Sequence, residues 1–259
     1  MGLNKIISEL KIPEGHIGII WMSQAGFIFK TSQGELIGID LYLSDCVERL
    51  VGFKRLMPKL IDYRELNLDY LICSHEHPDH LDIDALPEFI KKGTRLIGTK
   101  SCRKKLEEIG CDPNKMIEIN EGKQRDFVNF TIEGVYADHG DLSPDAIGIV
   151  LWFENFKIYF TGDTAYRPEK MKRVILLRPE ILILPINGKY NNLNTEEAAK
   201  LTALIRPDIV IPCHFWMFKE HNGDPQAFVE SLKKYASQIK PLFTTPGEVY
   251  IYPKLKVKL

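Results

Sequence analysis

Six consecutive residues, His-Glu-His-Pro-Asp-His at positions 75–80, place the strongest constraint on how this chain can fold. They follow an apolar run over residues 68–73, which is typical of a short buried strand. The loop at the end of that strand therefore carries three imidazoles and one carboxylate, which are preferred ligands of zinc and similar divalent ions. Four such side chains so close in sequence cannot all reach one ion without severe strain. They can serve two neighbouring ions, in the pairs His75 with His77 and Asp79 with His80.

Three further candidate ligands follow other predicted strands: His139 after residues 127–136, Asp163 after residues 157–160, and His214 at the end of residues 209–214. If these strands share a direction, their carboxyl ends bring the side chains to one edge of the sheets. Gly162 allows the backbone a close approach just before Asp163. The seven candidates then divide into His75, His77 and His139 for one ion, Asp79, His80 and His214 for the other, and Asp163 as a bridge.

Such a pair of ions predicts hydrolytic chemistry. Two divalent ions about 3.5–4 Å apart lower the pKa of a bound water to about 7 and so supply hydroxide at neutral pH. They also polarise a carbonyl or phosphoryl oxygen, so no serine or cysteine nucleophile is needed. Asp79 and Asp163 are the candidate catalytic residues that would position the hydroxide. The ligand types suit zinc, manganese or iron.

The remaining pattern alternates strands with helices in both halves of the chain. Strands are predicted over residues 16–22, 25–30, 35–40, 68–73, 94–98, 116–119, 127–136, 147–153, 157–160, 181–186, 209–214 and 248–257. Helices are predicted over residues 83–92, 100–109, 194–206 and 224–239. Residues 41–66 fit either a helical connection or a cover over a pocket. Without a linker or repeat, the pattern predicts one domain over residues 1–259, with two packed sheets and helices outside.

The motif order His75-x-His77-x-Asp79-His80, His139, Gly162-Asp163-Thr164 and His214 resembles the signature of the metallo-β-lactamase superfamily across nearly the whole chain. The resemblance implies an α+β fold, a four-layer αββα sandwich, with a dinuclear site and the same division of ligands. Within that superfamily, the chain looks most similar to the L-ascorbate-6-phosphate lactonase family. The segments that carry this closer likeness are residues 20–21, 26–27, 188–191 and above all 210–216. That family is associated with manganese or zinc and opens a phosphorylated lactone ring.

Several polar residues near the strand ends are candidates for binding an anionic substrate group. Lys189, Tyr190 and Asn191 follow a predicted strand, Arg167 follows Asp163, and His221 lies in a polar loop after His214. A solvated surface position explains each of them equally well. Asp40, at the end of another predicted strand, is a candidate partner for the free ring nitrogen of a ligand histidine.

The sequence thus favours a lactonase that acts on a small, phosphorylated sugar lactone. The alternatives are a phosphodiesterase or nuclease of the same fold, or a metal-dependent sensor without turnover. With 34 basic and 35 acidic residues, the chain has no global positive field to attract nucleic acid or an anionic membrane. Five scattered cysteines and an N-terminus unlike a signal peptide predict a cytoplasmic protein. The oligomeric state stays open, a homo-oligomer included.

Overall fold

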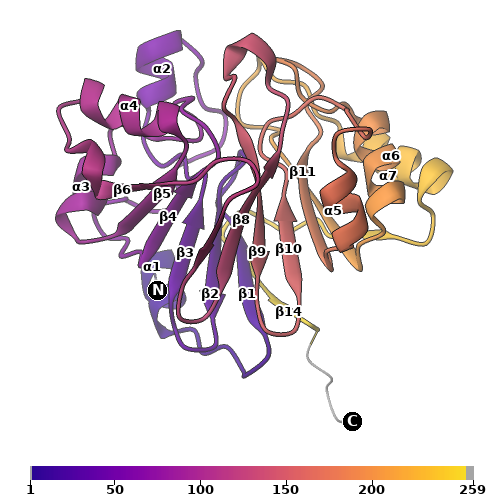
Figure 1. Ribbon diagram of the computed structural model, residues 1–259, viewed down its shortest axis with the longest axis horizontal. Helices are drawn as coiled ribbons and strands as arrows, with labels where there is room; N and C mark the ends of the chain where they lie inside the picture. Colours follow the sequence, from indigo (N-terminus) through magenta and orange to yellow (C-terminus); the bar gives the residue numbers. More distant parts are fainter. Residues whose placement is uncertain (1, 255–259) are drawn as a thin grey trace.

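Two seven-stranded sheets form the centre of the protein, which a computed structural model describes for residues 2–254 (Figure 1). The first sheet has the order β14-β1-β2-β3-β4-β5-β6, with β1 (Ile17–Trp21), β2 (Phe27–Thr31), β3 (Leu36–Ile39), β4 (Tyr70–Cys73), β5 (Arg95–Gly98), β6 (Met116–Glu118) and β14 (Val249–Tyr252). The second sheet has the order β13-β12-β11-β10-β9-β8-β7, with β7 (Gln124–Asp126), β8 (Thr131–Tyr136), β9 (Ile147–Trp152), β10 (Lys157–Phe160), β11 (Ile181–Pro185), β12 (Ile209–Cys213) and β13 (Lys240–Pro241).

Helices cover the outer faces of both sheets, as Figure 1 shows. On the side of the first sheet lie α1 (Leu3–Glu9), α2 (Cys46–Val51), α3 (Leu86–Lys91) and α4 (Lys100–Glu108). On the side of the second sheet lie α5 (Lys172–Leu177), α6 (Thr195–Ile205) and α7 (Pro225–Tyr235). The predicted four-layer αββα sandwich is therefore confirmed. No helix within residues 2–254 is both long and apolar enough to cross a bilayer.

The central strands are buried on both faces, and β4 shows why its sequence is apolar throughout. Successive side chains of a strand point to opposite faces. Tyr70 and Ile72 therefore join the core between the sheets, whereas Leu71 and Cys73 join the core beneath α3 and α4. An uninterrupted apolar run, rather than an alternating one, is the pattern expected of a strand covered on both sides.

The strand directions bring the loops of interest to one edge. Strands β3 to β6 are parallel in the first sheet, and β10 to β13 are parallel in the second. Strand β8 runs in the same direction as β10, because each of them is antiparallel to β9. Within each sheet, the strands that precede the candidate ligands thus share a direction.

Most predicted elements are present, and the differences have local causes. The strand predicted over residues 127–136 begins only at Thr131, because Phe127 N–H donates to the Phe130 carbonyl (2.8 Å) and closes a turn. The two rings stack, with centroids 4.9 Å apart, and both pack on Tyr70, so their apolar character serves the core from a turn. Helix α7 ends at Tyr235 rather than 239. Residues 255–257 of the last predicted strand lie outside the described residues.

The helix predicted after residue 194 starts as its sequence suggests. The Asn194 side chain accepts hydrogen bonds from the backbone N–H groups of Glu196 and Glu197, at 3.0 Å each. The Glu197 carboxylate accepts one in return from Asn194 N–H, at 3.0 Å. This reciprocal pair is a capping box, and it satisfies donors that the first turn of α6 would otherwise leave unpaired.

Candidate metal centre

The loop after β4 turns sharply and aims its side chains at the second sheet. The His77 carbonyl accepts hydrogen bonds from the backbone N–H groups of His80 (2.9 Å) and Leu81 (2.7 Å). This turn separates His75 and His77 from Asp79 and His80, in the two pairs that the sequence predicts. All seven candidate ligands converge at this edge.

The first group consists of His75, His77 and His139. His77 Nδ1 lies 3.1 Å from His75 Nε2 and 3.3 Å from His139 Nε2. His77 Nε2 lies 3.0 Å from the carbonyl oxygen of Leu142, which can only accept a hydrogen bond. The proton of His77 therefore sits on Nε2, and its Nδ1 lone pair faces the other two rings. Three imidazole nitrogens within reach of one point form a donor set suited to a divalent ion.

The second group consists of Asp79, His80 and His214. Asp79 Oδ2 lies 3.5 Å from His80 Nε2 and 3.4 Å from His214 Nε2. His80 Nε2 is buried and has no hydrogen-bond partner among the described residues. A buried polar nitrogen without a partner is costly, and coordination to a cation would satisfy it.

Asp163 lies between the two groups. Its Oδ1 is 3.4 Å from His80 Nε2, and its Oδ2 is 3.4 Å from His214 Nε2 and 3.8 Å from His139 Nε2. The side chain of Asn192 donates to Oδ2 at 2.8 Å and fixes the carboxylate. The preceding Gly162 has φ +61°, and a Cβ there would lie 2.8 Å from the Ile147 carbonyl oxygen, so the approach of this turn to β9 requires glycine.

Asp40 contacts a candidate ligand from behind, as its position after β3 predicts. Its carboxylate is fully buried and accepts from His80 Nδ1 (2.6 Å), Ser74 N–H (2.7 Å) and the Ser74 hydroxyl (2.5 Å). A carboxylate can only accept, so His80 presents an N–H at Nδ1 to Asp40 and turns Nε2 toward the other candidate ligands. Three donors thus hold the Asp40 carboxylate in a position that fixes the orientation of the His80 ring.

Gln24 contacts the candidate ligands, although no sequence pattern selects it. Its Nε2 donates to Asp79 Oδ2 at 2.8 Å and lies 3.1 Å from His214 Nε2. The backbone carbonyl oxygen of Gln24 accepts a hydrogen bond from His214 N–H at 2.9 Å, which joins the β1–β2 turn to the end of β12. A polar residue in a hairpin turn carries no signal of such a contact. Only the folded structure, which brings this turn beside Asp79 of the same sheet and His214 of the other, reveals it.

The backbone around these groups is unusually constrained. Gln24 (φ +50°), Asp40 (φ +45°), Tyr190 (φ +54°), Asn191 (φ +60°) and His214 (φ +62°) all adopt the left-handed region. Residues other than glycine enter this region at an energetic cost, and they persist there only where the surrounding structure enforces it. Their concentration at one edge is consistent with a candidate site there.

The charges of the site call for a cation. Burial opposes ionisation of Asp163, but the neighbouring His214 and His80 hold its pKa well below the usual range. Burial likewise disfavours charged His214, yet Asp163 and Asp79 raise its pKa to about 9. Burial lowers the pKa of His139 to about 4, so this ring is neutral. Anionic carboxylates that draw protons onto adjacent imidazoles are balanced equally well by bound divalent ions, and the residues therefore fit a metal.

A cavity of about 240 Å³ opens directly above the candidate ligands. Its floor includes five of them, His77, Asp79, His139, Asp163 and His214. Its walls come from Val47, Val51, Phe53, Pro78, Leu142, Tyr190, Phe218 and His221. Residues 41–66 thus supply both a short helix, α2, and part of the pocket wall, which answers the question that the sequence left open.

The residues predicted to bind an anionic group divide between the cavity and its surroundings. Tyr190 and His221 line the cavity, and burial beside His214 lowers the pKa of His221 to about 4. Lys189 Nζ instead donates to the Glu220 carbonyl oxygen at 3.1 Å, and Asn191 donates to the Asp138 carbonyl oxygen at 2.9 Å. Arg167 forms an ion pair with Asp138, at 3.0 Å. These three side chains are absent from the described lining.

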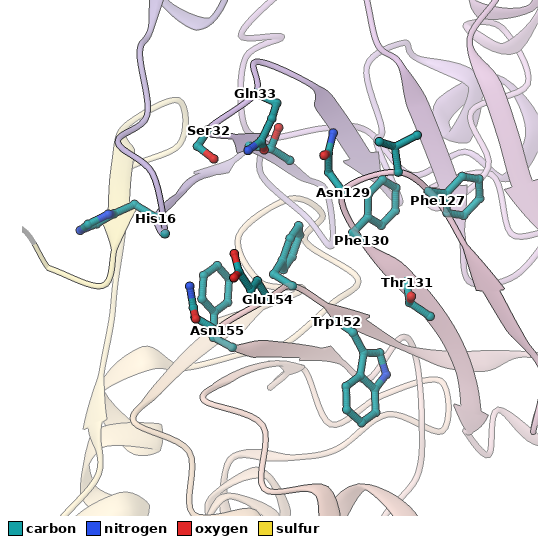
Figure 2. Close-up of a pocket in the computed structure, with 15 residues that line it drawn as sticks. His16, Ser32, Gln33, Phe127, Asn129, Phe130, Thr131, Trp152, Glu154 and Asn155 are labelled. Atoms are coloured by element: carbon teal, nitrogen blue, oxygen red, sulfur yellow. The ribbon is translucent and has the colours of Figure 1, made fainter.

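A larger cavity, of about 430 Å³, lies at the opposite ends of the strands (Figure 2). Its walls come from the turns after β2, β7 and β9, and Figure 2 shows aromatic side chains such as Trp152 and Phe130 beside the polar Asn129 and Glu154. None of the seven candidate ligands lines it. The smaller cavity is therefore the one that the chemistry of the site selects.

Comparison with known proteins agrees with this geometry. Residues 18–214 match the family described as Beta-lactamase superfamily domain. A UPF0173 metal-dependent hydrolase of Staphylothermus marinus is 30% identical over 195 residues, which cover 75% of this chain and 83% of that protein. A second, of Hyperthermus butylicus, is 24% identical over 233 residues, or 89% of this chain and 97% of that one.

Solved structures share the fold. Igni18, a metallo hydrolase of Ignicoccus hospitalis, superposes with a TM-score of 0.73 at 23% identity, covering 93% of this chain and 100% of that one. YhfI of Bacillus subtilis, a metallo-β-lactamase fold protein, gives a TM-score of 0.67 at 17% identity, covering 91% and 99%. The chain therefore belongs to the β-lactamase superfamily, as a metal-dependent hydrolase of the UPF0173 family.

Proposed function

We propose that this protein is a lactonase, or a hydrolase of closely related esters, whose centre holds two divalent ions, zinc or manganese, with iron also suited. The observation that carries the proposal is the presence of two three-residue donor groups that share no member, with Asp163 between them. Bound there, the ions would supply hydroxide at neutral pH and stabilise negative charge on the attacked carbonyl group.

The roles of the side chains follow from their contacts. His75, His77 and His139 would hold one ion, Asp79, His80 and His214 the other, and Asp163 would be shared. Behind them, Gln24 directs the Asp79 carboxylate, Asn192 directs Asp163, and Asp40 keeps the proton of His80 on Nδ1. Asp79 and Asp163 are the carboxylates placed to accept a hydrogen bond from the attacking oxygen.

Two polar groups of the wall would contact the substrate. His221 stacks on His214, with ring centroids 4.7 Å apart, and it is neutral at physiological pH because its pKa is about 4. A neutral imidazole can donate its N–H to the carbonyl or ring oxygen of a lactone without adding charge to the site. Tyr190, whose ring centroid lies 5.3 Å from that of His221, adds a hydroxyl at the same side of the cavity.

The absence of a protein nucleophile in the cavity is consistent with this chemistry. No serine or cysteine is among the described residues that line it. Cys73 and Cys213 are the cysteines nearest in sequence to the ligands. Both are buried thiols, and burial raises the pKa of each well above its usual range. Attack by water, rather than by a serine or cysteine side chain, is the course that this lining supports.

The test is to replace His77 or Asp163 by alanine and to measure both lactone hydrolysis and bound metal. We expect each variant to lose activity together with metal. His16→Ala is the matched control, because His16 borders the opposite cavity and touches no candidate ligand. Retention of full activity and metal content by both variants would overturn the proposal.

Phosphodiester hydrolysis is the alternative on the same ligands, because the proposed ions could also activate attack on phosphorus; the cavity wall adds no cationic group that would favour it. An anionic diester needs cationic partners once it leaves water. Among residues 2–254, no lysine or arginine lines this cavity. A panel of lactones and chromogenic phosphodiesters, assayed on the metal-loaded protein, separates the two reactions directly.

A further inference from the structure

The wall of the cavity above the candidate ligands is mostly apolar, which bears on the chemistry of the substrate. We propose that the substrate carries an uncharged apolar group, a short alkyl chain or a single ring, next to the bond that is cleaved. The inference rests on the proposed function for the bond, but it concerns the part of the ligand that is recognised. It replaces the phosphorylated sugar, which the sequence favours, by an apolar ester or lactone.

Three separate segments supply the apolar wall. Helix α2 contributes Val47 and Val51, and the chain just beyond it contributes Phe53. The segment after β12 contributes Phe218, whose ring centroid lies 6.1 Å from that of Phe53. Leu142 of the short 3₁₀ helix after His139 completes the mouth. Segments far apart in the sequence thus present one kind of surface to the same space.

Part of this apolar surface is left uncovered. Val51 is 52% exposed, Leu142 is 50% exposed and Tyr190 is 43% exposed. Single exposed apolar residues are ordinary, but these three share the lining of one cavity. Contact with an apolar group would remove this surface from water, which contributes about 25 cal/mol for each Å² buried.

Three cationic side chains from the segments that form the wall are engaged elsewhere. Arg55 pairs with Asp45 at 3.3 Å and donates to the Ser44 carbonyl oxygen at 2.8 Å. Arg49 pairs with Asp84, and Lys189 donates to the Glu220 carbonyl oxygen. A phosphate group that entered the cavity would lose its hydration without gaining a cationic partner from the wall, which is unfavourable.

The size of the cavity limits the apolar group. At about 240 Å³ it is smaller than the roughly 300–1,000 Å³ of pockets for drug-sized ligands. Part of that space must hold the reacting carbonyl above the ligands. A chain of a few methylenes or one ring therefore fills what remains, and longer chains would project into solvent.

The experiment measures kcat/KM of the zinc-loaded protein for p-nitrophenyl esters from acetate to decanoate and for γ-lactones with matching side chains. We expect kcat/KM to rise about fourfold for each methylene that enters the cavity, and then to level off. Leu142→Ser and Val51→Ser should each weaken this dependence on chain length. The matched controls, Leu176→Ser and Val128→Ser, replace leucine and valine residues that are 82% and 90% exposed away from the cavity, and they should preserve it.

A binding measurement separates this inference from the proposed function. Calorimetry with the alkanoates butyrate to octanoate, and with glucose 6-phosphate, needs no turnover. Affinity that rises with chain length and exceeds that for the sugar phosphate supports the apolar site, even if no ester or lactone is hydrolysed and the proposed function fails. Hydrolysis whose rate ignores chain length, with tighter binding of glucose 6-phosphate, would overturn the apolar site and leave the lactonase proposal standing.

Discussion

Replacement of Asp40 by asparagine should weaken metal binding although Asp40 is not one of the seven candidate ligands. Asp40 accepts three hydrogen bonds, two from Ser74 and one from His80 Nδ1. An asparagine offers one acceptor and one donor in place of two acceptors. If its NH₂ faces His80, the imidazole proton must move to Nε2, the atom that points at Asp79 and Asp163. If the amide is reversed, its NH₂ meets the N–H of Ser74, which cannot accept.

The magnitude follows from these two choices. A buried donor left facing another donor costs about 1–3 kcal/mol. Partners behind a metal-ligating histidine typically contribute 10–100-fold to metal affinity, or about 1.4–2.7 kcal/mol. Both routes give the same range. We therefore expect Asp40→Asn to raise the dissociation constant for Zn²⁺ by about 10–100-fold.

The assay is competition for Zn²⁺ between the protein and a chromophoric chelator at neutral pH. Asp82→Asn is the matched control, because Asp82 is also buried and accepts from Leu43 N–H (2.8 Å), Ser44 N–H (2.7 Å) and the Ser44 hydroxyl (2.6 Å), but from no histidine. It should lower the free energy of unfolding and spare Zn²⁺ affinity. Wild-type affinity in Asp40→Asn, or an equal loss in Asp82→Asn, would refute the tautomer argument.

Three further changes test other contacts. Gln24→Leu removes the hydrogen bond that Gln24 donates to Asp79 Oδ2. Because a hydrogen bond to a charged group contributes about 1.5–3 kcal/mol, chelator competition should show about 10–100-fold weaker Zn²⁺ binding. Unchanged Zn²⁺ binding would contradict this role of Gln24. Asn194→Ala removes the capping box of α6 and should lower the free energy of unfolding in urea by about 1 kcal/mol. A loss smaller than that from an alanine substitution at an uncapped helix start would show that the cap contributes no stability. Burial opposes ionisation of Glu133, but hydrogen bonds from Arg173 (2.7 Å) and Gln124 outweigh it and hold its pKa below the usual value. A carboxyl group whose pKa is lowered in the folded state stabilises the fold at pH values above its ordinary pKa, and this contribution is lost as the pH falls through the folded-state pKa. Glu133→Gln should therefore be less stable than wild type at neutral pH, and the difference in free energy of unfolding should shrink in acid. A difference that grows in acid would contradict this prediction.

The fold could be predicted where the sequence pattern has one cause. Strands such as β4, which are covered on both faces, read as apolar runs, and the cap at Asn194 marked the start of α6. Strand β7 was missed because its residues, Gln124–Asp126, are exposed and polar and depend on pairing with β8. Helix α5 was missed because Lys172–Leu177 is too short to show a helical period.

The site divides in the same way. Dense motifs and strand ends were enough to select the seven candidate ligands, because metal ligands are chemically distinctive. Gln24 and Asn192 could not be selected, since amide side chains in turns are common and their value here lies only in what they face. The apolar wall from α2 escaped as well, because a valine that lines a pocket reads like one that packs in a core.

The division of the candidate ligands between the sheets has a mechanical consequence. Each group of three draws two residues from the loop after β4 and one from the second sheet: His139 after β8 for one, His214 after β12 for the other. An ion in either group would act as a cross-link, closing the long stretches of chain from His77 to His139 and from His80 to His214. Closing long loops restricts the unfolded chain most. Metal binding should therefore cross-link the two sheets of the sandwich and stabilise their packing against each other.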